Sequence, residues 1–182
     1  MRLFLTHSFY RIMDSKLKDS VLFSLAEILE VNRDKIMEAN EADKQAFPDM
    51  DESMMDRLKV DNNKIDGMIR SLKEVASQAD PEGKILYETV REDGLRVSNR
   101  TVPFGTILII YESRPDVTIE AGATAFKAGN RILLKGGKEA FHTNTLLTQL
   151  WHQALLQNGV NKNRVEYLSL SHAETQQLIK EN

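Results

Sequence analysis

Two short apolar runs without polar alternation mark the second half of the chain. They cover residues 106–111 and 131–135. Such runs are typical of β-strands buried on both faces, as in a parallel sheet covered by helices. Arg114-Pro115 ends the first run, because a residue that precedes proline is pushed out of the α region. A third short strand is predicted over residues 164–170.

Apolar residues recur at helical spacing in the segments between these strands and in most of the first 80 residues, and they predict helices there. One apolar stripe contains Leu17, Val21, Leu22, Leu25, Ile28 and Leu29, and another contains Ile65, Met68, Ile69, Leu72 and Val75. Asp61-Asn62-Asn63 offers N-cap side chains for the second of these helices. Between them the sequence predicts a helical piece over 32–40, a loop over 41–51 and a short link over 56–60. Residues 1–16 carry no recognisable motif.

Helices are also expected over residues 117–128, 139–157 and 173–180. Asp116 is the candidate N-cap of the first, and Gly129 suits the left-handed position that ends it. Asp93-Gly94 lies between two strand-like runs, residues 86–92 and 95–101, and predicts a hairpin with a two-residue turn.

The predicted fold class is therefore α/β: a partial Rossmann-like parallel sheet flanked by helices, with N-terminal helices and a β-hairpin arm. Three regions follow from this pattern. Residues 1–84 form a helical lead-in, residues 85–102 the hairpin, and residues 103–182 a βαβαβα segment.

Composition excludes several classes of protein. The 182 residues carry a net charge of −3 without a basic stripe, so no nucleic-acid partner is expected. The sequence contains no run of 18 apolar residues, so no membrane span is expected. The apolar stretch at the N-terminus is too short for a secretory signal, so a cytoplasmic location is expected. The chain has no cysteine, which excludes disulfides and a thiol nucleophile within it. The four histidines, His7, His142, His152 and His172, form no metal-binding pattern.

Polar groups follow both apolar strands, where ligands of βαβ units bind. Tyr111-Glu112-Ser113-Arg114 follows the first strand, and Lys135-Gly136-Gly137-Lys138 follows the second. Lysine can pair with phosphate or bind a ribose, and glycines let a ligand approach the backbone. The alternative is that these lysines are solvated surface residues after a tight turn. The GxGxxG dinucleotide fingerprint is absent.

Several segments together resemble the γ-glutamyl phosphate reductase family of the aldehyde dehydrogenase superfamily. They are Pro103-Phe104-Gly105, Tyr111-Glu112-Ser113-Arg114-Pro115, Ala128-Gly129-Asn130 and Lys135-Gly136-Gly137-Lys138-Glu139. The resemblance covers most of the chain from about Leu17 onward. It implies NADPH-dependent reduction of L-γ-glutamyl 5-phosphate to L-glutamate 5-semialdehyde in proline biosynthesis.

The resemblance also implies residue roles. Ile109, Ile110 and Tyr111 would line the cofactor cleft, with Lys135 and Gly136 at the adenosine ribose. Lys138 stands where many relatives have an acid that grips the ribose hydroxyls, and a lysine suits the 2′-phosphate of NADPH better.

Ser113 and Arg114 would face the acyl phosphate in the whole enzyme. Ser113 stands where general aldehyde dehydrogenases have an oxyanion-hole asparagine. Arg114 is a planar, permanently charged group suited to carboxylate or acyl phosphate. The alternative for Arg114 is a structural salt bridge with Glu112 or Asp116.

The family nucleophile is a cysteine in a later domain, and we expect that domain to be absent here and the chain alone to be inactive. The resemblance also implies a homo-oligomer formed through the hairpin arm; the alternative is a hairpin that lies on its own domain. Two other functions stay open: another acyl reductase of the superfamily, or a non-catalytic nucleotide-binding or assembly module.

Overall fold

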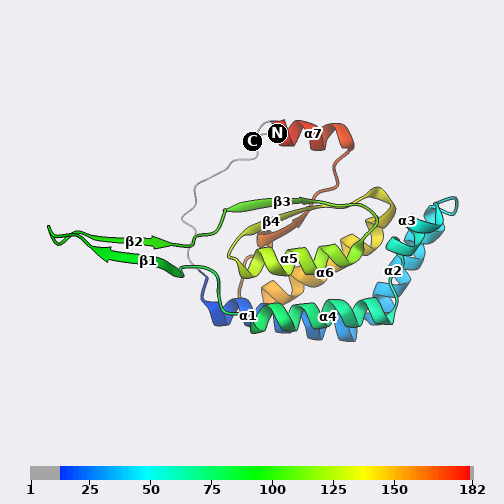
Figure 1. The fold of residues 1–182 in the computed structure, drawn as a ribbon. Helices are drawn as coiled ribbons and strands as arrows, with labels where there is room; N and C mark the ends of the chain where they lie inside the picture. The colour runs from blue at the N-terminus through cyan, green and yellow to red at the C-terminus, as the bar shows by residue number, and fades with distance from the viewer. Residues whose placement is uncertain (1–12, 181–182) are drawn as a thin grey trace.

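A computed structural model describes residues 13–180 and consists of stacked layers with one projecting arm (Figure 1). The three-stranded sheet forms one layer, and helices α5 (Pro115–Lys127) and α6 (Phe141–Gln157) pack beneath it. Helices α1 (Ser15–Val31) and α4 (Asn62–Ser77) pack beneath α5 and α6. The predicted α/β class is confirmed. Residues 1–12, which include His7 and most of the segment without a motif, lie outside the described part. No helix within residues 13–180 is long and apolar enough to cross a membrane.

The sheet is parallel and has the strand order β3-β4-β5. Strand β3 spans Thr106–Ile110, β4 spans Arg131–Lys135 and β5 spans Val165–Tyr167, which is shorter than predicted. Central strand β4 is buried as expected, but the prediction that β3 is buried on both faces is wrong. Ile107 and Ile109 pack against the helices, whereas Ile110 on the opposite face is 51% exposed, because β3 lies at an edge of the described sheet.

Helix α5, Pro115–Lys127, crosses from β3 back to β4. It begins earlier than predicted, with Arg114 as the capping residue and Pro115 in the first turn, so Asp116 is not the N-cap. Proline suits this position because its missing N–H would have no partner there. Gly129 ends the helix at φ +84°, and its N–H and that of Asn130 bond to carbonyls of the last turn, as predicted.

Helix α6, Phe141–Gln157, follows a 3₁₀ turn, Lys138–Ala140, and α7 covers His172–Lys180. The predicted helix over 139–157 therefore starts with a tighter turn. Trp151 of α6 is fully buried and contacts Phe126 of α5, with ring centroids 5.7 Å apart.

The N-terminal helices are α1 (Ser15–Val31), α2 (Arg33–Ala46), α3 (Glu52–Leu58) and α4 (Asn62–Ser77). Of the three adjacent N-cap candidates, Asp61 caps α4. The loop predicted over 41–51 and the link over 56–60 are partly wrong, since α2 continues to Ala46 and α3 covers 52–58. Two polar residues in the second half of α2, Asn40 and Asp43, are buried rather than solvated. Asn40 donates to the carbonyl of Leu58 at 2.9 Å and accepts from the N–H of Val60 at 2.8 Å.

Strands β1 (Ile85–Val90) and β2 (Arg96–Arg100) form an antiparallel hairpin that projects from the body (Figure 1). The alternative in which the hairpin lies on its own domain is therefore wrong. Its connection is also longer than predicted. The N–H of Arg91 bonds to the carbonyl of Leu95, so three residues form the turn, with Gly94 at φ +83°. A turn of this length ends in a left-handed residue, a position that suits glycine.

A buried ionic cluster lies at the root of this arm. The Lys18 ammonium group on α1 is fully buried and pairs with Asp80 at 3.0 Å and Glu82 at 2.5 Å, just before β1. Buried charges of this kind need close partners, because the interior solvates them poorly. The cluster therefore fixes the chain where it leaves the body.

Candidate functional site

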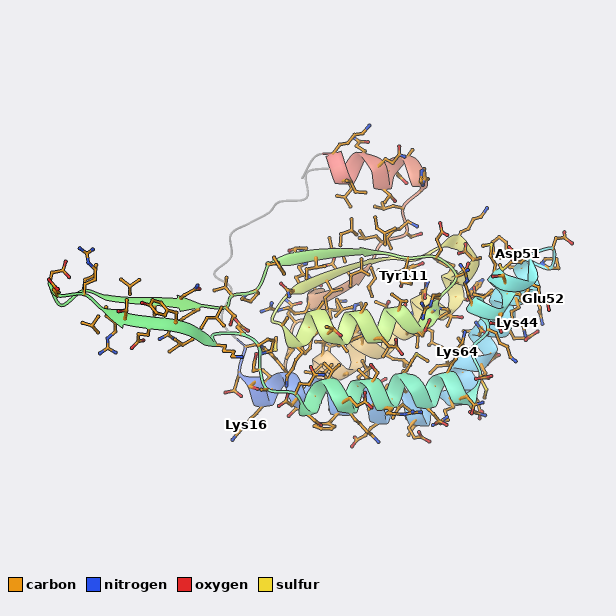
Figure 2. All side chains as sticks on the ribbon, viewed as in Figure 1. Lys16, Lys44, Asp51, Glu52, Lys64 and Tyr111 are labelled. Carbon is orange, nitrogen blue, oxygen red and sulfur yellow. The ribbon has the colours of Figure 1, made fainter. Side chains whose placement is uncertain are left out.

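The two predicted ligand-binding segments meet at one edge of the sheet. Ile110 lies opposite Lys135 in the strand register, and the N–H of Tyr111 donates to the carbonyl of Lys135 at 3.0 Å. Figure 2 shows Tyr111 at the end of the sheet that faces away from the arm. The sequence pattern therefore placed both segments at the same edge, as expected for the carboxyl ends of parallel strands.

A cavity of about 260 Å³ opens beside the second segment. Lys135, Gly136 and Lys138 line it, together with the ends of α2, α6 and β5. The Lys135 ammonium group donates to the carbonyl of Gly136 at 2.6 Å, and that of Lys138 lies 5.7 Å from the centre of the Phe47 ring. Two cationic groups at one cavity can attract an anionic ligand.

Both glycines of this loop make room for neighbouring side chains of the chain itself. A Cβ on Gly136 would overlap the amide of Asn144, and a Cβ on Gly137 would overlap the carboxylate of Glu139. The sequence prediction attributed the glycines to a ligand that approaches the backbone. The structure adds an internal reason for them, which is that the loop closes directly over buried polar groups.

The cofactor candidates on β3 differ in their surroundings. Ile109 packs into the core and Ile110 is half exposed. The hydroxyl of Tyr111 lies 2.6 Å from that of Thr118, which donates to Asn144 at 2.9 Å. Burial raises the pKa of the Tyr111 phenol well above its ordinary value, so this hydroxyl stays protonated at neutral pH.

Ser113 is buried and has the left-handed φ of +38°. Its N–H and its hydroxyl both donate to the same oxygen of Glu139, at 2.9 and 2.8 Å. Sequence reasoning did not assign a role to Glu139. The only signal was its place at the end of the Lys-Gly-Gly-Lys-Glu segment.

Arg114 is exposed, and its guanidinium pairs with Asp116 at 3.0 Å. The hydrogen bond to Asp116 raises the pKa of Arg114 further above its ordinary value. One of the two salt bridges named as alternatives for Arg114 is thus present. The Arg114 side chain is 54% exposed and can reach solvent, whereas that of Asp116 is 15% exposed and its second oxygen is buried without a hydrogen-bond partner.

Asp43 is a second residue that sequence reasoning missed. It comes from α2 and is 1% exposed, yet its carboxylate caps the start of α6. It accepts from the N–H groups of His142 and Thr143, both at 2.8 Å, and from the Thr143 hydroxyl at 2.6 Å. The positive end of the α6 dipole therefore already has an anionic partner beside the cavity.

The arrangement of layers, sheet and arm has the fold of an aldehyde dehydrogenase segment. The NADP⁺ complex of succinic semialdehyde dehydrogenase from Streptococcus pyogenes aligns with 92% of this chain and 34% of its own, with a TM-score of 0.62 and 19% identity. At this level of identity the likeness concerns the fold alone. No family model matches the chain.

Sequence comparison narrows this class. γ-Glutamyl phosphate reductase of Ligilactobacillus salivarius is 39% identical over 158 residues, which are 87% of this chain and 38% of the relative. The crystal structure of γ-glutamyl phosphate reductase from Thermotoga maritima has a TM-score of 0.90 and 35% identity, over 93% of this chain and 42% of that one. The chain belongs to the γ-glutamyl phosphate reductase family and corresponds to the N-terminal part of its members. It spans about two fifths of the length of the relatives it matches.

Proposed function

We propose that this chain is the cofactor-binding N-terminal portion of an NADPH-dependent reductase. The whole enzyme would convert L-γ-glutamyl 5-phosphate to L-glutamate 5-semialdehyde in proline biosynthesis. The observation that carries the proposal is the cavity that brings Lys135, Gly136 and Lys138 together at the sheet edge. The family membership supports the substrate, since the relatives are named for it.

NADPH would bind with its phosphorylated ribose at this cavity. A volume of about 260 Å³ suits a part of the cofactor rather than all of it. Because Asp43 occupies the N-terminus of α6, a 2′-phosphate would have to rely on the lysines instead of the helix dipole. Lys138 is exposed and can turn towards such a phosphate.

When bound, NADPH supplies the hydride of the family reaction. Residues of this chain would orient the substrate: Arg114 exchanges Asp116 for the acyl phosphate, and Ser113 shapes the turn that presents Arg114. The chain contains no cysteine, so we expect it to produce no semialdehyde by itself. The arm would pair with a second subunit, because isolated two-stranded hairpins are marginal in water.

Calorimetric titration with NADPH and then NADH tests the cofactor site. We expect wild-type chain to prefer NADPH, Lys135→Ala to lose binding of both cofactors, and Lys138→Ala to lose the preference for NADPH. Lys16→Ala is the matched control, since Lys16 is an exposed lysine on α1 far from Tyr111 (Figure 2). Equal affinity of Lys135→Ala and Lys16→Ala for NADPH would contradict the proposed site.

A further inference from the structure

The turn after β3 is joined to the loop after β4 through one buried carboxylate. Glu139 is 8% exposed, and one of its oxygens accepts both donors of Ser113. Ser113 has the left-handed φ of +38°, a conformation that costs energy for a residue other than glycine. Some interaction must hold it there, and Glu139 provides the two hydrogen bonds found at that position.

The same carboxylate is held from the other side by the glycine loop. The position of a Cβ on Gly137 overlaps the Glu139 oxygens, so the loop closes around the carboxylate only because this residue has no side chain. The charge of Lys135 also acts favourably on the Glu139 carboxylate. Glu139 thus contacts the predicted substrate turn and the predicted cofactor loop at once.

We infer that Glu139 is a positioning residue that makes the Ser113–Arg114 turn and the Gly136–Lys138 loop move as one unit. This inference rests on the proposed function, because it links the two segments proposed to bind substrate and cofactor. The consequence is that cofactor binding at the loop stiffens the turn that presents Arg114, without any direct contact between the cofactor and Arg114.

Amide hydrogen exchange, followed residue by residue by NMR, tests the link in the 182-residue chain. Glu139→Gln keeps an oxygen that can accept both bonds but loses the charge, whereas Glu139→Ala loses both bonds. We expect the Ser113 amide to exchange slightly faster in Glu139→Gln and at least about tenfold faster in Glu139→Ala, since bonds to charged acceptors contribute that much. The amide of Arg131, bonded to Gly105 at the far end of the sheet, serves as the internal reference.

Gly137→Ala provides an independent route to the same result. The added methyl group must displace the carboxylate, so a change in the cofactor loop should expose the amide of Ser113, which lies 24 positions earlier in the sequence. Lys138→Ala changes the same loop without touching the carboxylate and should leave the Ser113 amide as protected as in wild type.

Three outcomes would overturn the inference. The first is that the Ser113 amide exchanges at the wild-type rate in both Glu139→Ala and Gly137→Ala. The second is that exchange accelerates equally at the amides of Ser113 and Arg131. The third is that NADPH binds to wild type but leaves the exchange rate of the Ser113 amide unchanged. Failure of the proposed function looks different. If wild type binds no NADPH but the variants expose Ser113 selectively, the positioning role stands and the cofactor site does not.

Discussion

Replacing Asp43 by asparagine should weaken the fold and strengthen anion binding in the neighbouring cavity. The carboxylate is buried and accepts three hydrogen bonds from the first turn of α6. In the variant one oxygen becomes an NH₂ group, which leaves the N–H of either His142 or Thr143 facing a donor, depending on how the amide is oriented. An unsatisfied buried donor costs about 1–3 kcal/mol, and the lost interaction of a charge with the helix dipole adds up to about 2 kcal/mol. We therefore expect a loss of about 2–4 kcal/mol.

Urea unfolding measures this loss from the shift in midpoint at constant slope. Asp51→Asn is the matched control, because Asp51 also caps a helix, accepting from the N–H of Met54 at 3.0 Å, but it is exposed at the start of α3 (Figure 2). Asparagine is as good an N-cap as aspartate in such a place, so the control should lose only a few tenths of a kcal/mol.

The effect on binding has the opposite sign. Asp43 lines the cavity, and removing its charge removes repulsion of a phosphate there. At a separation of about 8 Å and an effective dielectric constant of about 40, this is about 1 kcal/mol, or roughly fivefold tighter binding of NADPH. A variant that is less stable by under about 1 kcal/mol, or that binds NADPH more weakly while still folded, would refute the reasoning.

Three further predictions concern the turn after α5, the stability of the fold in acid and the self-association of the chain. Gly129→Ala should lower the free energy of unfolding in urea by about 3 kcal/mol, because φ at this residue is +84° and the new methyl group would lie 2.5 Å from Glu82 and 2.8 Å from Pro103. Gly83→Ala is the control: it has a similar φ of +75° but open space around the Cβ position, and it should lower that free energy by only about 1 kcal/mol. Burial raises the pKa of Glu139, but its own N–H, the donors of Ser113 and the charge of Lys135 outweigh this, so the net pKa is lowered. The stability that Glu139 contributes is therefore complete above about pH 4.5 and is lost as pH falls through the lowered pKa. The difference in unfolding free energy between wild type and Glu139→Gln should disappear over that pH range, and a difference independent of pH would contradict the reasoning. Replacing residues 85–100 by a short glycine-serine linker should abolish the self-association that we expect in sedimentation velocity, and a wild-type chain that stays monomeric at all concentrations would speak against the arm as an assembly element.

Local patterns were sufficient for the elements and for the meeting of the two segments. Apolar runs, helical stripes and the glycine at position 129 report on the residues beside them, and parallel strands bring their ends together by geometry alone. The same logic failed at the end of α2, where the polar segment from residue 41 was interpreted as a loop, although the helix continues to Ala46 and buries Asn40 and Asp43. Their partners at Leu58, Val60 and Thr143 are distant in sequence, and no local pattern reveals that a polar residue is buried against them.

The sequence predicted that the two segments meet, but not the hydrogen bonds between them. Lys135, Gly136 and Lys138 line one cavity. The hydrogen bond from Ser113 to Glu139, in contrast, depends on a left-handed backbone conformation at Ser113, and a serine gives no sign of that conformation in the sequence, as a glycine or asparagine would. The misjudged exposure of Ile110 has a similar cause: a strand sequence does not tell whether it lies at the edge or in the centre of a sheet.

The ionic cluster around Lys18 lies at the root of the arm and therefore controls the direction in which the arm points. Its six-residue strand β1 is about 20 Å long at the usual rise per residue. A rotation of about 10° at the root would then carry the tip by about 3–4 Å, which is most of the spacing between paired strands. Hydrogen bonds between charged groups depend on direction, whereas apolar contacts do not, so the pairs of Lys18 with Asp80 and Glu82 resist such a rotation. A substitution at Lys18 would thus displace the tip of the arm, far from the altered side chain.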